Sequence, residues 1–370
     1  MKKLLYKLLL YLNYLVVLLL LLAYLSVYIS PADVWIFSFL GLAYPYLLIF
    51  NLIFVGWWVY RKKMVFLISL VAIIIGWNYL ASYFQIPLTE EKRDKVFQEE
   101  MGKDSSLKVM SYNVRLFNRY NWAHNEEAKS NIFAFIKKQD PDVVCLQEFY
   151  ANPSEGLSLQ DIEQKLSFLP YHHVFFTLQQ TRQQGYGLAI FSRYPLVSKS
   201  VIRFPESLNA TIYTDLKRGK DTLRIFNNHL QSIRFRKNNM EFFNKLRFQY
   251  NEKQIQELKD ISNRLKQAVI KRAHQVDTIK KELLHSPYPV ILTGDFNDPP
   301  TSYAYYTLKK DGLKDAFTQA GKWTGNTYIG KMPSFRIDYI LYSESLSAYT
   351  FRTWRVKHSD HYPLTTYIVP

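Results

Sequence analysis

The sequence lacks several features that would define its class at once. It has a single cysteine, Cys145, so an internal disulfide is excluded and the redox compartment stays undetermined. It has no internal repeat and no low-complexity segment, so a repeat array is not expected. Charge is almost absent from the first 84 residues outside two basic clusters. This lack of charge is the first feature that indicates the class of the protein.

Three long apolar runs occupy this part of the chain, at residues 4–28, 34–60 and 64–84. Each reaches the roughly 20 apolar residues that a bilayer requires. A cleaved signal peptide has one short apolar core, so three long runs argue against one. Buried core helices are the alternative, but runs this long and uncharged rarely occur in a soluble core. We therefore predict a transmembrane anchor of three helices in residues 1–84.

The basic residues around these runs predict an orientation. Lys2, Lys3 and Lys7 precede the first run, and three basic residues at 61–63 separate the second from the third. The loop at residues 30–33, between the first two runs, has no Lys or Arg. The positive-inside rule places the basic segments in the cytoplasm. We therefore predict an integral protein of the inner or plasma membrane, with everything after the third span extracytoplasmic.

The rest of the chain divides into a linker and a folded domain. Residues 85–106 are polar and rich in charge, which is typical of a solvated linker. From Leu107 onward, short β-prone runs alternate with longer helical ones, and this predicts an α/β fold for residues 107–370. Strands are expected at 107–114, 142–147, 187–191, 222–227 and 335–342, and a helix at 126–138.

One long stretch, residues 238–284, contains neither Pro nor Gly and is rich in Lys and Arg. Its apolar residues recur at helical spacing, so we expect a helix. Two interpretations of its charge stay open. The first is a solvated face with i,i+4 ion pairs. The second is a patch that holds an anionic substrate or bilayer surface, formed by Arg234, Arg236, Lys237, Lys245 and Arg247.

Polar residues gather where β-prone runs end. Asp295 and Asn297 directly follow an apolar run, and Asp360 and His361 follow a later β-prone run. Side chains two residues apart on an extended chain face the same way, so Asp295 and Asn297 share a face. A second carboxylate beside a histidine supplies a base and a metal ligand. The two clusters together predict metal-assisted hydrolysis of a phosphoester.

Short motifs along the domain resemble those of the endonuclease/exonuclease/phosphatase superfamily, which has a deoxyribonuclease-like fold. They are Ser-Tyr-Asn-Val-Arg at 111–115, Leu-Gln-Glu at 146–148, Gly-Leu-Ala-Ile-Phe-Ser at 187–192, Asn-His-Leu at 228–230, Gly-Asp-Phe-Asn at 294–297, Arg-Ile-Asp-Tyr-Ile at 336–340 and Ser-Asp-His at 359–361. Each alone is weak, but together they occur in the family's order. The resemblance implies a four-layer α/β sandwich with two mixed β-sheets, here preceded by three transmembrane helices.

The resemblance also implies a site. The expected catalytic residues are His361, Asp338, His229, Asp295 and Asn297. The expected substrate-binding residues are Asn113, Arg115, Asn297 and His229. The expected ligands of a Mg²⁺ or Mn²⁺ ion are Glu148, Asn113 and Asp360.

In this interpretation His361 is the general base for the attacking water and Asp338 orients its imidazole. Asp360 is either a second metal ligand or a partner of the first. Which of Asp295 and His361 accepts the proton stays open. Arg115 stands where abasic-site endonucleases of this superfamily carry an acidic residue, so the pattern resembles the deoxyribonuclease branch more.

The substrate class stays open, because nucleases, sphingomyelinase-like phosphodiesterases and inositol-phosphate phosphatases share this core. The formal charge of +16 suits either nucleic acid or an anionic lipid surface. We expect a membrane-anchored, nuclease-type phosphodiesterase, with a phosphohydrolase of lipid headgroups as the alternative. The expected partners are the phosphoester substrate and the lipid bilayer, and no obligate protein partner is evident.

A non-catalytic, polyanion-binding protein on the same fold is the alternative from a different class. Such a protein is expected to lose the metal-binding Glu, the Asp-x-Asn pair or the terminal His. Glu148, Asp295, Asn297 and His361 are all present, so the sequence favours an enzyme.

Overall fold

A computed structural model describes residues 2–87, 95, 97, 105–120, 127–181, 184–205, 207–233, 239, 252–330 and 335–369. The chain forms two compact units. One unit combines residues 1–83, 233–274 and 298–307, and the other combines residues 84–232, 275–297 and 308–370. The first unit is built on helices and the second on β-sheet, so each has a core of its own.

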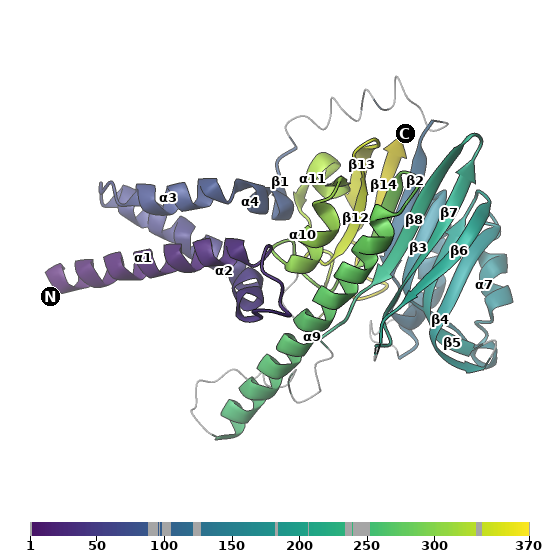
Figure 1. Ribbon diagram of the computed structural model, residues 1–370, viewed down its shortest axis with the longest axis horizontal. Helices are drawn as coiled ribbons and strands as arrows, with labels where there is room; N and C mark the ends of the chain where they lie inside the picture. Colours follow the sequence, from purple (N-terminus) through teal and green to yellow (C-terminus); the bar gives the residue numbers. More distant parts are fainter. Residues whose placement is uncertain are drawn as a thin grey trace. The chain divides into compact units, whose positions relative to one another are not determined.

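Two six-stranded sheets form the second unit (Figure 1). In spatial order, the first sheet contains β10 (Leu313–Asp315), β12 (Asp338–Ser343), β9 (Val290–Asp295), β8 (Asp221–His229), β7 (Ala210–Arg218) and β6 (Leu196–Arg203). The second contains β13 (Ser347–Thr353), β14 (Leu364–Val369), β2 (Leu107–Asn113), β3 (Val143–Ala151), β5 (Gln184–Ser192) and β4 (Tyr171–Thr181).

Both sheets are mixed. The pairs β8–β9 and β2–β3 are parallel, whereas the other strand pairs within the two sheets are antiparallel. This confirms the predicted α/β fold with two mixed sheets. A short antiparallel pair, β1 (Phe84–Gln85) with β11 (Trp323–Thr324), lies outside them.

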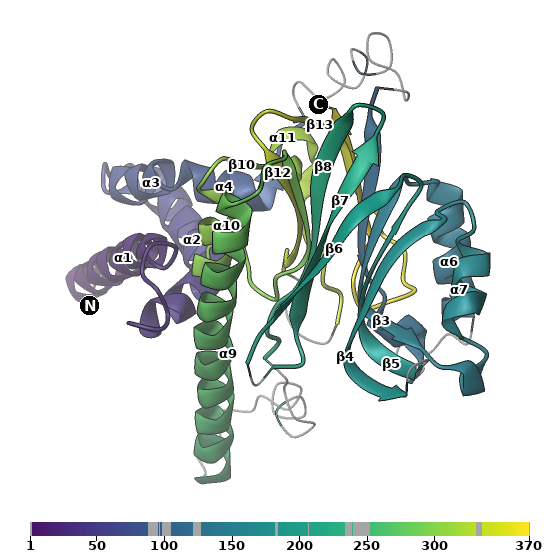
Figure 2. The same cartoon turned by 45° about the vertical axis from the view of Figure 1, so that its right-hand side comes forward.

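Strand alternation divides the apolar residues between two cores. Val109 and Cys145 of one sheet and Ile212 and Ile291 of the other belong to the cluster between the sheets. The opposite face of the β2–β3 sheet packs against α6 (Ala128–Gln139) and α7 (Leu159–Lys165), which Figure 2 shows beside these strands.

The outer face of the other sheet is covered by the last part of α9 (Glu252–Leu284). Val276 and Ile279 of this helix are fully buried. Tyr213 of β7 points away from the inter-sheet core and donates a hydrogen bond to Glu282, at 3.1 Å. Helices therefore lie outside both sheets, which gives the four layers of a sandwich.

The element boundaries differ from the sequence predictions in two informative places. The strand predicted at 142–147 continues to Ala151, because a bulge at Glu148 bends it without ending it. The long basic helix begins at Glu252 within the described residues. The five basic residues of the predicted patch and most of the predicted linker lie outside the described residues.

The N-terminal helices form the apolar part of the first unit. Helices α1 (Lys2–Leu25) and α2 (Ile36–Tyr60) are each long and apolar enough to cross a membrane. The third apolar run forms α3 (Phe66–Ile75) and α4 (Trp77–Tyr83), which are bent by 70° and make a third span if both parts belong to one crossing. The bend is at Gly76, where a Cβ would lie 2.1 Å from the Tyr24 hydroxyl, so only glycine permits this approach.

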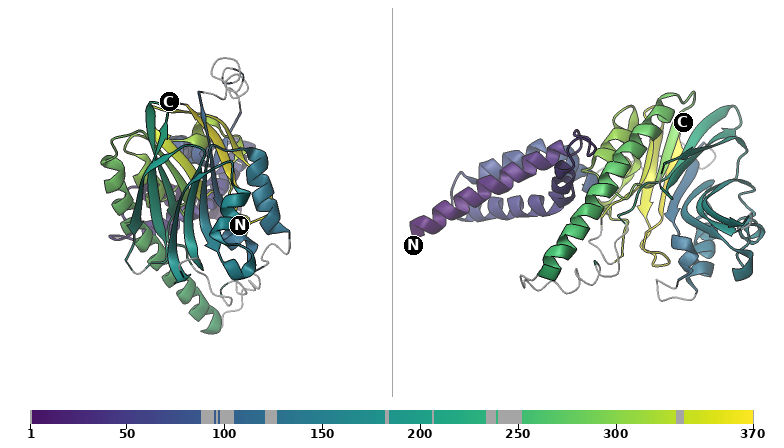
Figure 3. Two further views of the ribbon diagram at one scale, coloured as in Figure 1. Left: turned by 90° about the vertical axis from the view of Figure 1, so that its right-hand side faces the viewer. Right: turned by 60° about the horizontal axis from the view of Figure 1, so that its bottom comes forward.

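Polar side chains join these helices along their length. Asn13 of α1 donates to Ser69 of α3 at 2.7 Å and accepts from the indole of Trp58 in α2 at 2.8 Å. All three side chains are buried. Hydrogen bonds of this kind hold helices together where the surroundings are apolar, and the right panel of Figure 3 shows the helices running side by side.

Candidate active site

Strand register brings three of the predicted site residues to one edge of a sheet. His229 ends β8 and Asp295 ends the parallel strand β9, and the two residues are register partners. Asp338 begins the antiparallel strand β12 and is the register partner of Asp295 on the other side. The three side chains therefore come from adjacent strands at the same level of the sheet.

The second sheet contributes Asn113 and Glu148. Asn113 ends β2 and is the register partner of Gln147 in the parallel strand β3. Glu148 follows in the interior of β3, at a register shift between Leu146 and Phe149, and has a positive φ of 49°. The strand predicted at 142–147 would place Glu148 just past its end. A bulge achieves the same result, since it re-aims one side chain while the strand continues.

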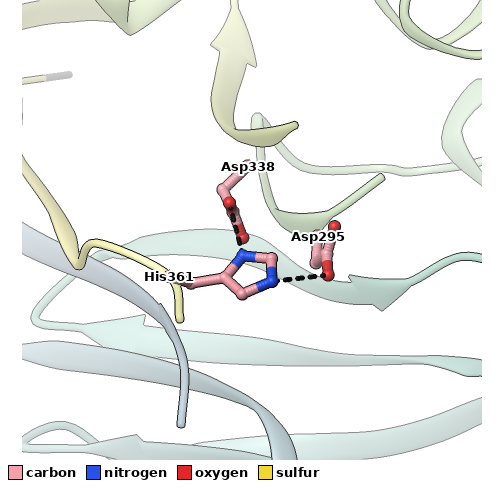
Figure 4. Close-up of side chains that lie close together, drawn as sticks. All are labelled: Asp295, Asp338 and His361. Carbon is pink, nitrogen blue, oxygen red and sulfur yellow. Dashed lines mark hydrogen bonds and ion pairs between the residues drawn. The ribbon is translucent and has the colours of Figure 1, made fainter. Parts of the chain in front are cut away.

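A buried Asp–His–Asp chain lies at the centre of the site (Figure 4). His361 Nδ1 is 2.8 Å from Asp338 Oδ2, and His361 Nε2 is 3.8 Å from Asp295 Oδ2. All three residues are at most 5% exposed. Because Nδ1 donates to Asp338, the other ring nitrogen is the one presented toward Asp295.

These contacts shift the proton affinities of both partners. Burial raises the pKa of Asp295 to about 8, and the neighbouring Asp338 carboxylate adds to this increase. Burial alone would lower the pKa of His361, but the Asp338 and Asp295 carboxylates raise it well above its ordinary value. Both groups on the Asp295–His361 contact therefore bind a proton more readily than they would in water.

Asn113 and His229 connect this chain to Glu148. The Asn113 carboxamide donates to Asp295 Oδ2 at 3.1 Å and to Glu148 Oε1 at 3.4 Å. His229 Nε2 lies 3.9 Å from both of these carboxylates. Residues from both sheets therefore meet in one cluster.

Asp360 and Arg115 border the cluster as an ion pair. Ser359 donates to the backbone carbonyl of Asn113 at 2.8 Å, which ties the 359–361 segment to the end of β2. Arg115 begins a turn of four consecutive residues with positive φ, 115–118. Such a conformation is costly for side chains other than glycine, and strained turns of this kind concentrate at functional sites.

Asn297 contacts the cluster through Asp295 and also contacts the backbone that follows β8. Its backbone N–H donates to Asp295 Oδ1 at 2.8 Å, and its carboxamide donates to the carbonyl of Leu230 at 3.0 Å. Asn297 has a positive φ of 53°. The nine residues expected from the sequence thus lie in one network of contacts.

The donor set near Glu148 has the chemistry of a site for a hard divalent cation. Glu148 and Asp360 offer carboxylate oxygens and Asn113 offers a carboxamide oxygen, which are the ligands that Mg²⁺ and Mn²⁺ prefer. Burial raises the pKa of Glu148, and the charge of Asp360 raises it further. Like charges gathered at a partly buried site are what a bound cation would compensate.

One ligand atom each from Asp295, Asp338 and His361 also lies within 4.8 Å of the others. This trio is chemically different, because both ring nitrogens of His361 already face a carboxylate.

Two tyrosines join the site without a sequence motif that predicts them. The Tyr186 hydroxyl lies 3.5 Å from His229 Nδ1. The Tyr328 ring packs edge-on against His361, with ring centroids 5.3 Å apart, and the two residues form an isolated β-bridge. Tyr328 lies in a segment without regular structure, so neither periodicity nor spacing could identify it.

Comparison with known families gives two matches. Residues 110–361 match the model of the Endonuclease/Exonuclease/phosphatase family. Residues 6–83 match a second model, described as a domain of unknown function (DUF8431). A search of curated proteins finds no match.

Solved structures share the fold over 72% of this chain. A humanized D. rerio TDP2 with 14 mutations is 16% identical, with a TM-score of 0.50, and covers 72% of this chain and 100% of its own. The human Nocturnin catalytic domain with bound sulfate is 20% identical, with a TM-score of 0.50, covering 72% and 93%. An endonuclease/exonuclease/phosphatase from Beutenbergia cavernae is 17% identical, with a TM-score of 0.50, covering 72% of each chain.

Proposed function

Because the chain belongs to the endonuclease/exonuclease/phosphatase family, whose members are phosphoester hydrolases, we propose that it is a membrane-anchored, divalent-metal-dependent phosphoester hydrolase. One observation carries this proposal most directly. His361 lies between two buried carboxylates, at 2.8 Å from Asp338 and 3.8 Å from Asp295. That arrangement accepts a proton from water and stabilises the resulting imidazolium.

In the proposed reaction, water attacks phosphorus and the bond to the ester oxygen breaks. The water proton passes to the group of the Asp295–His361 pair that is deprotonated, and the raised pKa of both groups makes that group a strong base. Asp338 fixes the tautomer of His361 and balances its charge. A hydroxyl group remains on the phosphate, and the leaving oxygen takes a proton from the site or from solvent.

Glu148, Asn113 and Asp360 would hold the divalent cation, which when bound polarises a phosphoryl oxygen and neutralises developing charge. His229 lies 3.9 Å from Glu148 and from Asp295, where it is placed to donate to a phosphate oxygen. Arg115 would add positive charge to the substrate side. It lies next to the donor set, because its ion-pair partner Asp360 belongs to that set.

The substrate class has two candidates. A nucleic-acid substrate is supported by Arg115 and by the formal charge of +16. A lipid-headgroup substrate is supported by the two or three apolar helices at the N-terminus, which would bring the enzyme to a bilayer. We also propose that the catalytic domain is extracytoplasmic, because basic residues cluster before the first span and at 61–63.

The test is a screen of the full chain in lipid nanodiscs, first freed of metal by chelation and then supplied with Mg²⁺ or Mn²⁺. Soluble aryl phosphoesters report the chemistry, while DNA, RNA, sphingomyelin and inositol phosphates separate the substrate classes. His361→Ala should abolish turnover, whereas His285→Ala, a change at an exposed histidine, should not. Metal-independent turnover, or full activity of His361→Ala, would refute the proposal.

A further inference from the structure

The strands that carry the site become polar on their inner face before they reach it. On the face toward the other sheet, β8 runs from Ile225 through Asn227 to His229, and β3 runs from Val143 to Gln147. Ile225 and Val143 belong to the apolar core between the sheets, whereas Asn227 and Gln147 are fully buried carboxamides. Burying a carboxamide costs free energy unless it forms hydrogen bonds. Asn227 and Gln147 bond to each other across the inter-sheet core.

Asn227 joins the two sheets through both ends of its carboxamide. Its oxygen accepts from Gln147 Nε2 at 2.7 Å. Its nitrogen donates to the backbone carbonyls of Leu146 at 3.0 Å and Ala189 at 2.9 Å. Asn227 lies in β8 of one sheet, its partners lie in β3 and β5 of the other, and all four residues belong to the second unit. We call these three hydrogen bonds the Asn227 bridge.

The bridge is attached at the bulge that carries Glu148. Leu146 and Ala189 are register partners, and the register of β3 against β5 shifts directly after them, before Phe149. Glu148 lies within this shift and has a positive φ of 49°. A bulge interrupts the hydrogen-bond ladder, so the neighbouring strand holds the backbone less firmly there. The Asn227 bridge supplies hydrogen bonds from the opposite sheet at this point, and it therefore holds the backbone from which the Glu148 side chain projects.

The other end of the bridge lies beneath His229. Asn227 and His229 are two residues apart in β8, so their side chains share a face of the sheet. His229 Nε2 is 3.9 Å from Glu148 Oε1, although the two residues come from different sheets. Apolar packing between the sheets is non-directional, whereas hydrogen bonds require a particular distance and angle. The Asn227 bridge therefore fixes how β8 and the bulge of β3 lie against one another.

We propose that Asn227 is a positioning residue for the hydrolytic reaction: its carboxamide pins the bulge of β3 to β8 and thereby sets the separation of Glu148 from His229. Glu148 is the expected cation ligand and His229 the expected phosphate donor, so the proposal rests on the proposed function for its catalytic readout. It gives a role in the reaction to a buried side chain that touches neither substrate nor cation.

The experiment uses the full chain in nanodiscs and three variants. Asn227→Leu removes all three hydrogen bonds with little change of volume, and Asn227→Asp keeps the shape and the acceptor for Gln147. Asn228→Leu is the matched control, because Asn228 is equally buried but bonds only within its own sheet. It accepts from the Thr211 hydroxyl at 2.8 Å and donates to the Thr293 carbonyl at 2.7 Å.

Four quantities are measured for each variant. They are Tm, kcat on a soluble aryl phosphoester, Mn²⁺ affinity by calorimetry, and amide hydrogen exchange in a peptide that contains Glu148 and Phe149. Tm reports the general cost of lost hydrogen bonds. The exchange reports the bulge directly and does not depend on activity.

Both Leu variants should lower Tm, by about 5 °C or more, because each removes buried hydrogen bonds. Only Asn227→Leu should also accelerate exchange at Glu148. It should lower kcat by about a hundredfold, the effect of a displacement of about 1 Å in a catalytic site. It should weaken Mn²⁺ binding by about tenfold or more, as loss of a group that supports a ligand does. Asn227→Asp should lie between Asn227→Leu and the parent in each quantity.

Two results would overturn the proposal. One is parental kcat, Mn²⁺ affinity and exchange at Glu148 in Asn227→Leu. The other is an equal loss of kcat in Asn228→Leu, which would show that any buried hydrogen bond of β8 has the same effect. Should Asn227→Leu not fold, Asn227→Asp decides the question, because it adds no volume and removes at least one of the two donated bonds.

The positioning role and the proposed function fail in different ways. If the parent shows no metal-dependent turnover, the proposed function fails, and hydrogen exchange alone still decides whether Asn227 fixes the bulge. If the parent is active and Asn227→Leu keeps kcat, Mn²⁺ affinity and exchange, only the positioning role fails.

Discussion

Replacing Asp338 with Asn tests the centre of the site with the least disturbance of shape. The carboxylate is 2% exposed and accepts from His361 Nδ1 at 2.8 Å. The carboxamide has the same volume and keeps a neutral acceptor, so the core stays filled. What is lost is the negative charge beside the imidazolium that forms when His361 accepts a proton.

The size of this loss follows from Coulomb's law. Two unit charges about 4 Å apart interact by roughly 4 kcal/mol at an effective dielectric constant of 20. If the charge develops fully in the transition state, that energy corresponds to about a thousandfold in rate. The carboxamide can also rotate to present its N–H to Nδ1, which selects the wrong tautomer and deepens the loss. We therefore expect Asp338→Asn to lower kcat by about three orders of magnitude.

The assay is the steady-state hydrolysis of a soluble aryl phosphoester by the full chain in nanodiscs with Mn²⁺ or Mg²⁺. Asp140→Asn is the matched control: Asp140 is exposed at a helix end, pairs with Arg193 at 2.6 Å and has a left-handed φ that Asn tolerates. It should retain parental turnover. A kcat for Asp338→Asn within about tenfold of the parent would show that the charge of Asp338 does not act in the rate-limiting step. Equal losses in Asp338→Asn and the control would point to a general effect of the change.

Glu148→Gln should lose several orders of magnitude in kcat and bind Mn²⁺ more weakly by calorimetry, because the change removes a carboxylate from the donor set. Glu344→Gln, a control at an exposed position, should change neither kcat nor Mn²⁺ affinity. Parental Mn²⁺ affinity in Glu148→Gln would exclude Glu148 from the donor set. A reporter active only outside the cytoplasm, fused after Pro370, should be active, and activity of a cytoplasmic reporter there would mean that the bent third run does not cross. Burial, with the charge of Lys199, lowers the pKa of His173 to about 4 from its ordinary 6.5. The neutral ring therefore contributes stability that is present above pH 6.5 and is lost as the pH falls toward 4, on the order of 3 kcal/mol. His173→Gln should flatten the fall in Tm over this range, and an unchanged profile would exclude the residue as its cause.

Much of this protein could be predicted from local sequence pattern. The three apolar runs exceed the length that a bilayer requires, and that length and composition are visible without a structure. The α/β class follows from the alternation of β-prone and helical runs, because side-chain periodicity is a local property. The polar residues of the site were identified because Asn113, His229 and Asp295 each end a strand, and a strand end is marked by a change of composition.

The tertiary structure decided how those residues meet. Asn113 and Asp295 are 182 positions apart in the chain, and only the packing of two sheets brings the carboxamide within 3.1 Å of the carboxylate. Glu148 reaches the site through a bulge in the middle of β3, a one-residue change of register that hydrophobic alternation does not specify. Tyr328 reaches His361 from a segment with no periodicity.

The contact between Gly41 and Thr301 shows the same division most clearly. The sequence shows apolar helices at one end of the chain and a Pro-Pro pair after Asn297, but nothing in either pattern relates them. Gly41 and Thr301 are 260 residues apart. Their contact requires a glycine at position 41, because a Cβ atom there would collide with the carbonyl of Thr301. Local sequence determines which segments are helix, strand or membrane span, because periodicity and length act over neighbouring residues. Contacts between distant segments depend on shape complementarity in three dimensions, and so only the folded chain fixes them.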